Sequence, residues 1–279
     1  MGRMTGRWVA AVVIVSALLP LRGAGRAPKA LDLRSSSALV LDQGTGQPIF
    51  QKRPDEVLPI ASITKLATAM VVLDAGLDLD ETLTIQKEDV DGLKHSKSRL
   101  PVGTSLSRGQ ALHLALMSSE NRAAHALGRT YPRGLDAFVS AMNAKARSLG
   151  LTGTRFVDPA GLSSANVSTA KDLARMVEAA SQYPQIRRFT TCEEATISSK
   201  RRQITFHNSN RLVRSRRWEI GLSKTGFIEE AGRCLVMQAR VAQRSVVIVL
   251  LDSVGNLTRF GDANRVRQWL EGAFGARVR

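Results

Sequence analysis

The 279-residue chain contains few cysteines and histidines, and these shortages exclude several kinds of site. Two cysteines are too few for a disulfide-dense scaffold or a cysteine-rich zinc module. The four histidines form neither an H-E-x-x-H nor an H-x-H pair, so a histidine-built metal centre is not expected. We therefore expect a protein that works without a metal or another cofactor.

Acidic residues are also scarce relative to basic ones, with 24 Asp and Glu against 40 Lys and Arg, which gives a formal net charge of +16. Such an excess suggests a polyanionic partner, which could be a nucleic acid, an anionic membrane or an acidic polymer outside the cell. The hydrophobic fraction of 43% and the charged fraction of 23% are typical of globular proteins. The length fits one large domain or two interlocked ones.

Residues 8–21 (WVAAVVIVSALLPL) form an apolar run at the N-terminus that is too short to be a membrane anchor, since a span needs about 20 apolar residues. Arg3 and Arg7 precede it, and small residues follow at 23–25, which is the order of a secretory signal. We expect residues 1–25 to be removed, which lowers the charge to +16 − 3 = +13. Export predicts a periplasmic protein that binds no nucleic acid and keeps no stable membrane anchor.

Export to an oxidising compartment raises the question of a bond between Cys192 and Cys234. Cys234 lies in RCLVMQARV, which alternates like a strand, and a cysteine in such a position is more often a small core residue. The sequence favours that interpretation but leaves a disulfide open.

Strand-like segments lie at both ends of the chain and helical segments lie between them. Residues 38–41 and 48–50 flank a glycine-containing turn and predict a hairpin. Helices are expected from Ser62 to Gly76 and over 110–127, 134–149, 170–181 and 262–272, with strands from Ile186 onward. We therefore predict an α+β fold with an antiparallel sheet built from both chain ends. The predicted organisation is a linker at 26–37 and a catalytic domain at 38–275, with sheet parts 38–80 and 185–275 around a helical insertion at 81–184.

Three short motifs occur in the order typical of β-lactamases and penicillin-binding proteins: S-x-x-K at Ser62–Lys65, S-x-N at Ser119–Asn121, and K-T-G at Lys224–Gly226. Each alone is weak, because a second S-x-x-K occurs at Ser168–Lys171 and a second S-x-N at Ser164–Asn166. K-T-G is the rarest of the three motifs and occurs once. The order S-x-x-K, S-x-N, K-T-G is met when the S-x-x-K is the one at Ser62, because no S-x-N lies between Ser168 and Lys224.

Ser62 and Lys65 have the spacing of a nucleophile and its base. Residues three apart share one helical face, and helical side chains lean toward the N-terminus, so Lys65 reaches back to the Ser62 hydroxyl. A neutral Lys65 amine could then remove the hydroxyl proton. Burial and a nearby cation, for which Lys224 is the candidate, would both lower the pKa of Lys65.

Longer segments around these motifs resemble the low-molecular-mass penicillin-binding proteins, the serine D-alanyl-D-alanine carboxypeptidases and endopeptidases. They are VLPIASITKLATAMVVLDAG, FVDPAGLSSANVSTAKDLARM and KTGF…AGRCLVM, and the resemblance spans about residues 35–271. It is strongest to the short endopeptidase branch similar to penicillin-binding protein 7, since the chain stops without the further domain and anchor typical of the carboxypeptidases. The resemblance implies a β-lactamase/transpeptidase-like fold, a peptidoglycan substrate and acylation by β-lactams.

The resemblance also implies a role for each motif residue. Ser62 forms an acyl-enzyme, Lys65 takes its proton, and Ser119 and Asn121 complete the polar relay. Lys224 and Thr225 bind the carboxylate of the leaving group. Gly226 lets the strand approach the substrate, and the backbone N–H groups of Ser62 and Phe227 form the oxyanion hole.

Three other functions stay open. A D-alanyl-D-alanine carboxypeptidase would use the same residues. A class A-like β-lactamase would also need a glutamate within E-x-x-x-N, and Glu178, Glu193 and Glu194 lack the asparagine. A basic exported wall-binding protein without activity is the non-enzymatic alternative.

Overall fold

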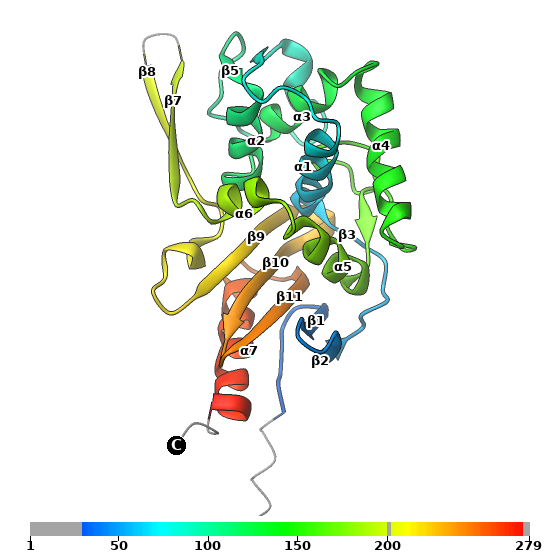
Figure 1. Ribbon diagram of the computed structural model, residues 1–279, viewed down its shortest axis with the longest axis vertical. Coiled ribbons are helices and arrows are strands. Elements are labelled where there is room, and N and C mark those ends of the chain that lie inside the picture. Colours follow the sequence, from blue (N-terminus) through cyan, green and yellow to red (C-terminus); the bar gives the residue numbers. More distant parts are fainter. Residues whose placement is uncertain (1–29, 200–201, 276–279) are drawn as a thin grey trace, which may run out of the picture.

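The computed structural model describes residues 30–199 and 202–275, so the predicted signal peptide at 1–25 lies outside the described residues. The molecule is elongated, with a five-stranded sheet at one end and a helical part at the other (Figure 1). Within the described residues, no helix combines the length and the apolar character that crossing a membrane requires.

The main sheet joins the two ends of the chain, as predicted. Its strand order is β2-β1-β11-β10-β9, and every neighbouring pair is antiparallel. The predicted hairpin supplies β1 and β2, and β1 then pairs with β11 along its whole length. The strands are β1 (Ser37–Asp42), β2 (Gln47–Lys52), β9 (Glu219–Ile228), β10 (Gly232–Val241) and β11 (Arg244–Ser253).

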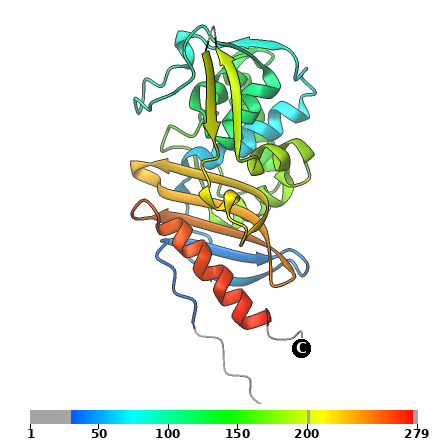
Figure 2. The same cartoon turned by 90° about the vertical axis from the view of Figure 1, so that its left-hand side faces the viewer.

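Each face of this sheet is covered by a separate apolar core, which explains why β10 and β11 are almost continuously apolar. One core includes Val236, Val247 and Val249 and continues into the helical part, where α5 (Ala170–Ala180) packs on the sheet. The other includes Val246 and Ile248 and packs against α7 (Thr258–Phe274), which crosses the opposite face (Figure 2).

The helical part begins with a short turn that packs against β9 and β10 of the sheet. A 3-10 turn, η1 (Ala61–Thr64), leads from β3 (Leu58–Pro59) into α1 (Lys65–Asp74). The expected helix at 110–127 is two helices separated by a break at residues 118–120. The remaining elements are β4 (Thr82–Thr84), η2 (Lys87–Asp89), β5 (Ser105–Ser107), α2 (Arg108–Met117), α3 (Asn121–Arg129), α4 (Gly134–Ser148) and β6 (Val167–Ser168).

The chain between α5 and β9 differs from the sequence-based expectation. Strands were expected from Ile186 onward, but Pro184–Thr191 is a helix, α6, because Pro184 occupies its first turn, where proline is favoured. The next two strands, β7 (Glu194–Ser199) and β8 (Arg202–His207), pair only with each other and stand beside the helical part rather than in the main sheet (Figure 1). Alternation predicts a strand but not its partner.

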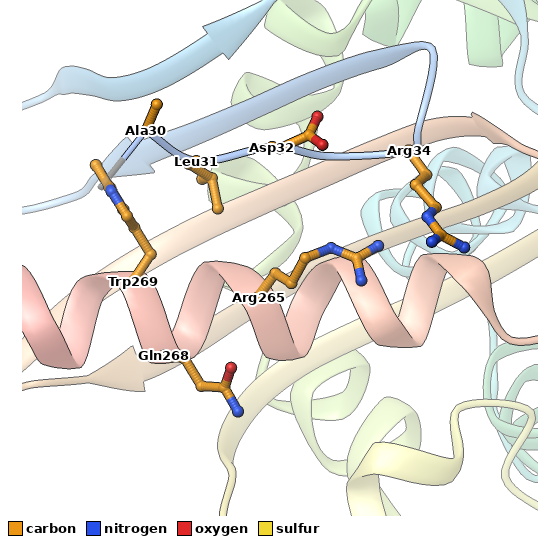
Figure 3. A pocket seen from close by; sticks show the side chains of 7 residues that line it. All are labelled: Ala30, Leu31, Asp32, Arg34, Arg265, Gln268 and Trp269. Atoms are coloured by element: carbon orange, nitrogen blue, oxygen red, sulfur yellow. The ribbon is translucent and has the colours of Figure 1, made fainter. Parts of the chain in front are cut away.

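Residues 30–34 lie along α7 and leave a pocket of about 450 Å³ between the two segments. Figure 3 shows Leu31 and Trp269 at one part of this pocket and the guanidinium groups of Arg34 and Arg265 at another. The pocket lies on the α7 side of the sheet. Both cysteines are free thiols, and Cys234 is buried in β10, as the strand interpretation favoured.

Candidate active site

Ser62 and Lys65 are in hydrogen-bond contact at the start of α1. Lys65 Nζ lies 2.8 Å from Ser62 Oγ, and its side chain is fully buried. The backbone carbonyl of Ala160 accepts from Lys65 Nζ at 2.6 Å and from Ser62 Oγ at 3.3 Å. The ammonium and the hydroxyl therefore share one acceptor and have a fixed mutual orientation, which a nucleophile and its base require.

The backbone around the nucleophile is strained. Ala61 has a φ of +48°, although it is not a glycine, and it directly precedes Ser62. Ser119 also has a positive φ, of +64°, at the break between α2 and α3. Left-handed conformations at non-glycine residues cost about 1–2 kcal/mol each, and such residues cluster at functional sites. The surrounding fold fixes both of these serines in position.

The S-x-N segment contacts both lysines of the other two motifs. Asn121 Oδ1 accepts from Lys65 Nζ at 2.7 Å, and Ser119 Oγ lies 2.8 Å from Lys224 Nζ. Ser119 and Asn121 lie at the break between α2 and α3, only two residues apart. Through these two contacts the segment links the nucleophile turn to strand β9. Glu120, between them, caps α3 by accepting from Arg122 N at 3.2 Å.

The K-T-G segment lies at the free edge of the sheet, because β9 is the last strand in the order. A Cβ at Gly226 would approach the Ile60 carbonyl oxygen to 2.8 Å, so only glycine lets the strand pass this close to the nucleophile turn. The structure thus brings all eight predicted site residues to one place: Ser62, Lys65, Ser119, Asn121, Lys224, Thr225, Gly226 and Phe227.

Burial lowers the pKa of Lys65 to about 7, against the opposing effect of the carboxylates of Asp158, Glu120 and Asp91. Burial also holds the pKa of Lys224 well below its usual range, with further lowering from Lys65 and then from Arg259. The repulsion between the two ammonium groups therefore acts at Lys224, while burial is what makes Lys65 a base near neutral pH.

Asp158 builds the loop that holds the shared acceptor, the Ala160 carbonyl. Its carboxylate accepts from the backbone N–H groups of Ala160 at 2.7 Å, Gly161 at 2.6 Å and Ser163 at 2.9 Å. Asn166 Nδ2 donates to the same carboxylate at 3.0 Å. The carboxylate thus orients the loop and also favours the charged form of Lys65.

Four contributors were missed in the sequence because no motif marks them. Ser96 Oγ accepts from Asn121 Nδ2 at 2.8 Å, and Ser209 Oγ accepts from Thr225 Oγ1 at 2.7 Å. Arg259 on α7 approaches Lys224 closely enough to lower its pKa. Asp158 is the fourth, and it lies in the segment FVDPAGLSSANVSTAKDLARM, which the family resemblance had already marked.

The pH dependence of acylation follows from the pKa of Lys65, the predicted base. Lys65 must be neutral to accept a proton, so the rate of acylation by a fluorescent penicillin should rise with pH, reach half its plateau near pH 7, and level off above it. At pH 5 the rate should be about 1% of the plateau. Asp158→Asn removes a charge that raises the pKa of Lys65, so its midpoint should move to lower pH.

The matched control is Asp172→Asn. Like Asp158, Asp172 accepts from a loop N–H, that of Gly153 at 2.7 Å, but it is not among the groups that shift the pKa of Lys65. Its midpoint should equal that of the unmodified chain. An unmoved midpoint in Asp158→Asn would show that this carboxylate does not act on the base.

Comparisons with known proteins agree with this geometry. Residues 24–255 match the family described as D-alanyl-D-alanine carboxypeptidase. The D-alanyl-D-alanine endopeptidase of Pseudomonas aeruginosa is 50% identical over 246 residues, which is 88% of this chain and 79% of that one. The endopeptidase of Escherichia coli is 48% identical over 242 residues, covering 86% and 78% of the two chains.

The solved structure of the Streptomyces K15 DD-transpeptidase superposes on this chain with a TM-score of 0.79 at 29% sequence identity. The match covers 85% of this chain and 97% of that one. This likeness confirms the predicted α+β fold of the β-lactamase and transpeptidase type.

Proposed function

This chain belongs to the D-alanyl-D-alanine carboxypeptidase family, and from that premise we propose that it is a DD-endopeptidase that hydrolyses D-alanyl–diaminopimelate crosslinks in peptidoglycan. The observation that carries the proposal is the buried Lys65 ammonium, 2.8 Å from Ser62 Oγ, in a chain about half identical to two proteins named as endopeptidases.

In the first step Ser62 Oγ attacks the carbonyl carbon of the D-alanyl residue while its proton passes to neutral Lys65. The negative charge that develops on the carbonyl oxygen is stabilised by the backbone N–H groups of Ser62 and Phe227, each worth about 3–4 kcal/mol in comparable enzymes. Asn121, which contacts Lys65 Nζ at 2.7 Å, keeps the ammonium in place after the transfer.

Collapse of this intermediate breaks the C–N bond and leaves an ester on Ser62. Ser119 donates its proton to the leaving amine and receives the proton that Lys65 took from Ser62, so Lys65 is neutral again for the second step. Ser119 Oγ is also in contact with Lys224 Nζ at 2.8 Å. Water then attacks the ester, Ser62 recovers its proton, and the product carries a new carboxylate. The cycle consumes one water and needs no other reactant.

Lys224, Thr225 and Arg259 form the anchor for the carboxylate next to the scissile bond. The Arg259 side chain is only 7% exposed, and its Nε and Nη1 atoms have no hydrogen-bond partner among the described residues. A buried guanidinium without an anion is costly, and a bound carboxylate would remove that cost. In a crosslink this carboxylate belongs to the D-centre of diaminopimelate.

We place this activity in the periplasm, where the substrate lies. The basic start, the apolar run at 8–21 and the small residues at 23–25 support export. The net charge of +13 after removal of residues 1–25 suits a polymer that carries free carboxylates. β-Lactams should acylate Ser62, since they present a reactive carbonyl and a carboxylate at a similar separation.

The deciding experiment incubates the purified chain with crosslinked muropeptide dimers and with monomeric pentapeptides. We expect dimers to be converted to monomers, with slower loss of terminal D-alanine from the pentapeptides. Intact dimers together with shortened pentapeptides would assign the chain as a carboxypeptidase. Rapid turnover of penicillin without a trapped adduct would favour the β-lactamase alternative.

A further inference from the structure

The loop that follows β8 is fixed to the ends of two helices. The side-chain amide of Asn208 donates to the carbonyl oxygens of Thr190 at 2.9 Å and Cys192 at 2.7 Å, at the end of α6. The backbone N–H of Ser209 donates to the carbonyl oxygen of Met117, the last residue of α2, at 2.9 Å. The fold therefore sets the position of Ser209 before any ligand binds.

The Ser209 hydroxyl group contacts the K-T-G segment and has a donor to spare. Its oxygen accepts from Thr225 Oγ1 at 2.7 Å. Within residues 30–199 and 202–275, the Ser209 hydroxyl donates no hydrogen bond in return. Because a hydroxyl group has one donor and two acceptor positions, Ser209 keeps an unused O–H beside the Thr225 oxygen.

The single hydroxyl proton of Thr225 cannot serve both Ser209 and a bound carboxylate. A carboxylate only accepts hydrogen bonds, so Thr225 must turn its proton away from Ser209 in order to bind one. The contact between the two hydroxyl groups then survives only if Ser209 turns its own proton toward Thr225 Oγ1. Both changes are rotations of O–H bonds, and no proton passes from one atom to another.

The reversed contact strengthens the hydrogen bond to the anion. Ser209 would donate to Thr225, and Thr225 would donate to the carboxylate, so the two hydroxyl groups point the same way. Hydrogen bonds aligned in a chain polarise one another, and those that end on a charged group are the strong ones. Since the loop already holds Ser209 in place, this chain forms with little loss of conformational entropy.

We propose that Ser209 is a positioning residue of the carboxylate anchor, whose hydroxyl group reverses its hydrogen bond with Thr225 when substrate binds and directs the Thr225 proton to the carboxylate. The inference rests on the proposed function, in which Lys224, Thr225 and Arg259 bind this carboxylate. It adds a fourth residue that acts through Thr225. The family motifs end at the K-T-G strand, whereas Ser209 belongs to a separate loop.

The first test compares acylation of Ser209→Ala by benzylpenicillin and by its methyl ester, which has the same reactive carbonyl but no charged carboxylate. We expect the second-order rate constant for benzylpenicillin to fall about tenfold, through weaker binding at a nearly unchanged limiting rate. The rate constant for the ester should stay within about twofold. Ser209→Thr keeps the hydroxyl group and should recover most of the loss.

The second test is a double-mutant cycle between Ser209→Ala and Thr225→Val, which removes the Thr225 hydroxyl at nearly constant shape. In the Thr225→Val background, Ser209→Ala should change acylation by benzylpenicillin less than about twofold, because Ser209 has no hydroxyl left to orient. Additive losses would show that Ser209 acts independently of Thr225 and would overturn the proposal.

Ser105→Ala is the matched control, since Ser105 Oγ lies 3.0 Å from Thr84 Oγ1 in another serine–threonine pair, between β4 and β5. It should change neither rate constant. Equal losses on penicillin and ester in Ser209→Ala, or no loss on either, would also overturn the role of Ser209. An unmodified chain that forms no adduct with benzylpenicillin would instead contradict the proposed function.

Discussion

Ser62→Ala is expected to lower kcat/KM for D-alanyl peptides by about 10⁵- to 10⁶-fold, because removing a nucleophile from a coupled catalytic set costs as much as removing the whole set. The variant should also form no covalent adduct with a fluorescent penicillin. Lys65 and the Ala160 carbonyl would remain 2.6 Å apart but would have no hydroxyl to activate. The measurements are steady-state hydrolysis and gel detection of the labelled protein.

The second S-x-x-K match supplies the control, Ser168→Ala. Ser168 Oγ contacts Thr154 Oγ1 at 2.7 Å, and Lys171 pairs with Asp55 away from the site. This variant should lose about 1 kcal/mol of unfolding free energy and keep its labelling. A Ser62→Ala protein that still binds penicillin covalently would show that another residue is the nucleophile.

Gly161→Ala should have the second-largest effect, because it affects both the fold and the site. Gly161 has a φ of +76°, and an added Cβ would lie 1.9 Å from the Ala61 carbonyl oxygen and 2.9 Å from Thr64 Oγ1. The nucleophile turn would have to move. We expect the free energy of unfolding to fall by about 2–4 kcal/mol, from overpacking and the left-handed backbone together.

Catalysis by Gly161→Ala should fall by at least about 100-fold, since displacements near 1 Å at a catalytic group have effects of that size. Gly150→Ala is the control, because its φ is +67° but no atom lies within 4 Å of the added Cβ. It should lose about 1 kcal/mol of stability and no activity. Thermal unfolding and penicillin acylation rates measure both effects, and near-normal acylation in Gly161→Ala would mean that the turn can shift without penalty.

The sequence predicts those parts of the site that depend on local geometry. Ser62 and Lys65 lie one helical turn apart, so their contact follows from helix periodicity alone. The strands β9 to β11 are predicted from their composition, whereas the break between α2 and α3, which carries Ser119, interrupts the helix expected at 110–127. The assembly of the three motifs was expected from their order and from the family resemblance.

The remaining parts depend on long-range packing, for which the sequence holds no local signal. Arg259 reaches Lys224 from α7, and Ser209 reaches Thr225 from a loop. The left-handed backbone conformation of Ala61 could not be predicted from the sequence, since alanine does not favour that conformation. The hairpin β7–β8 likewise forms strands as expected, yet only tertiary contacts decide that it stays outside the main sheet.

The pairing of β1 with β11 determines when this protein can fold during its synthesis. Among the described residues β1 pairs with β2 and with β11, and β11 ends at Ser253, so a nascent chain must keep its first strand without its main partner until more than 200 further residues have been made. A large sequence separation between paired strands slows folding. Lys224 also arrives late, after the other motif lysine and both motif serines. A chain that ends before β11 therefore lacks both a complete main sheet and an assembled active site, and cleavage activity requires that β11 has been made.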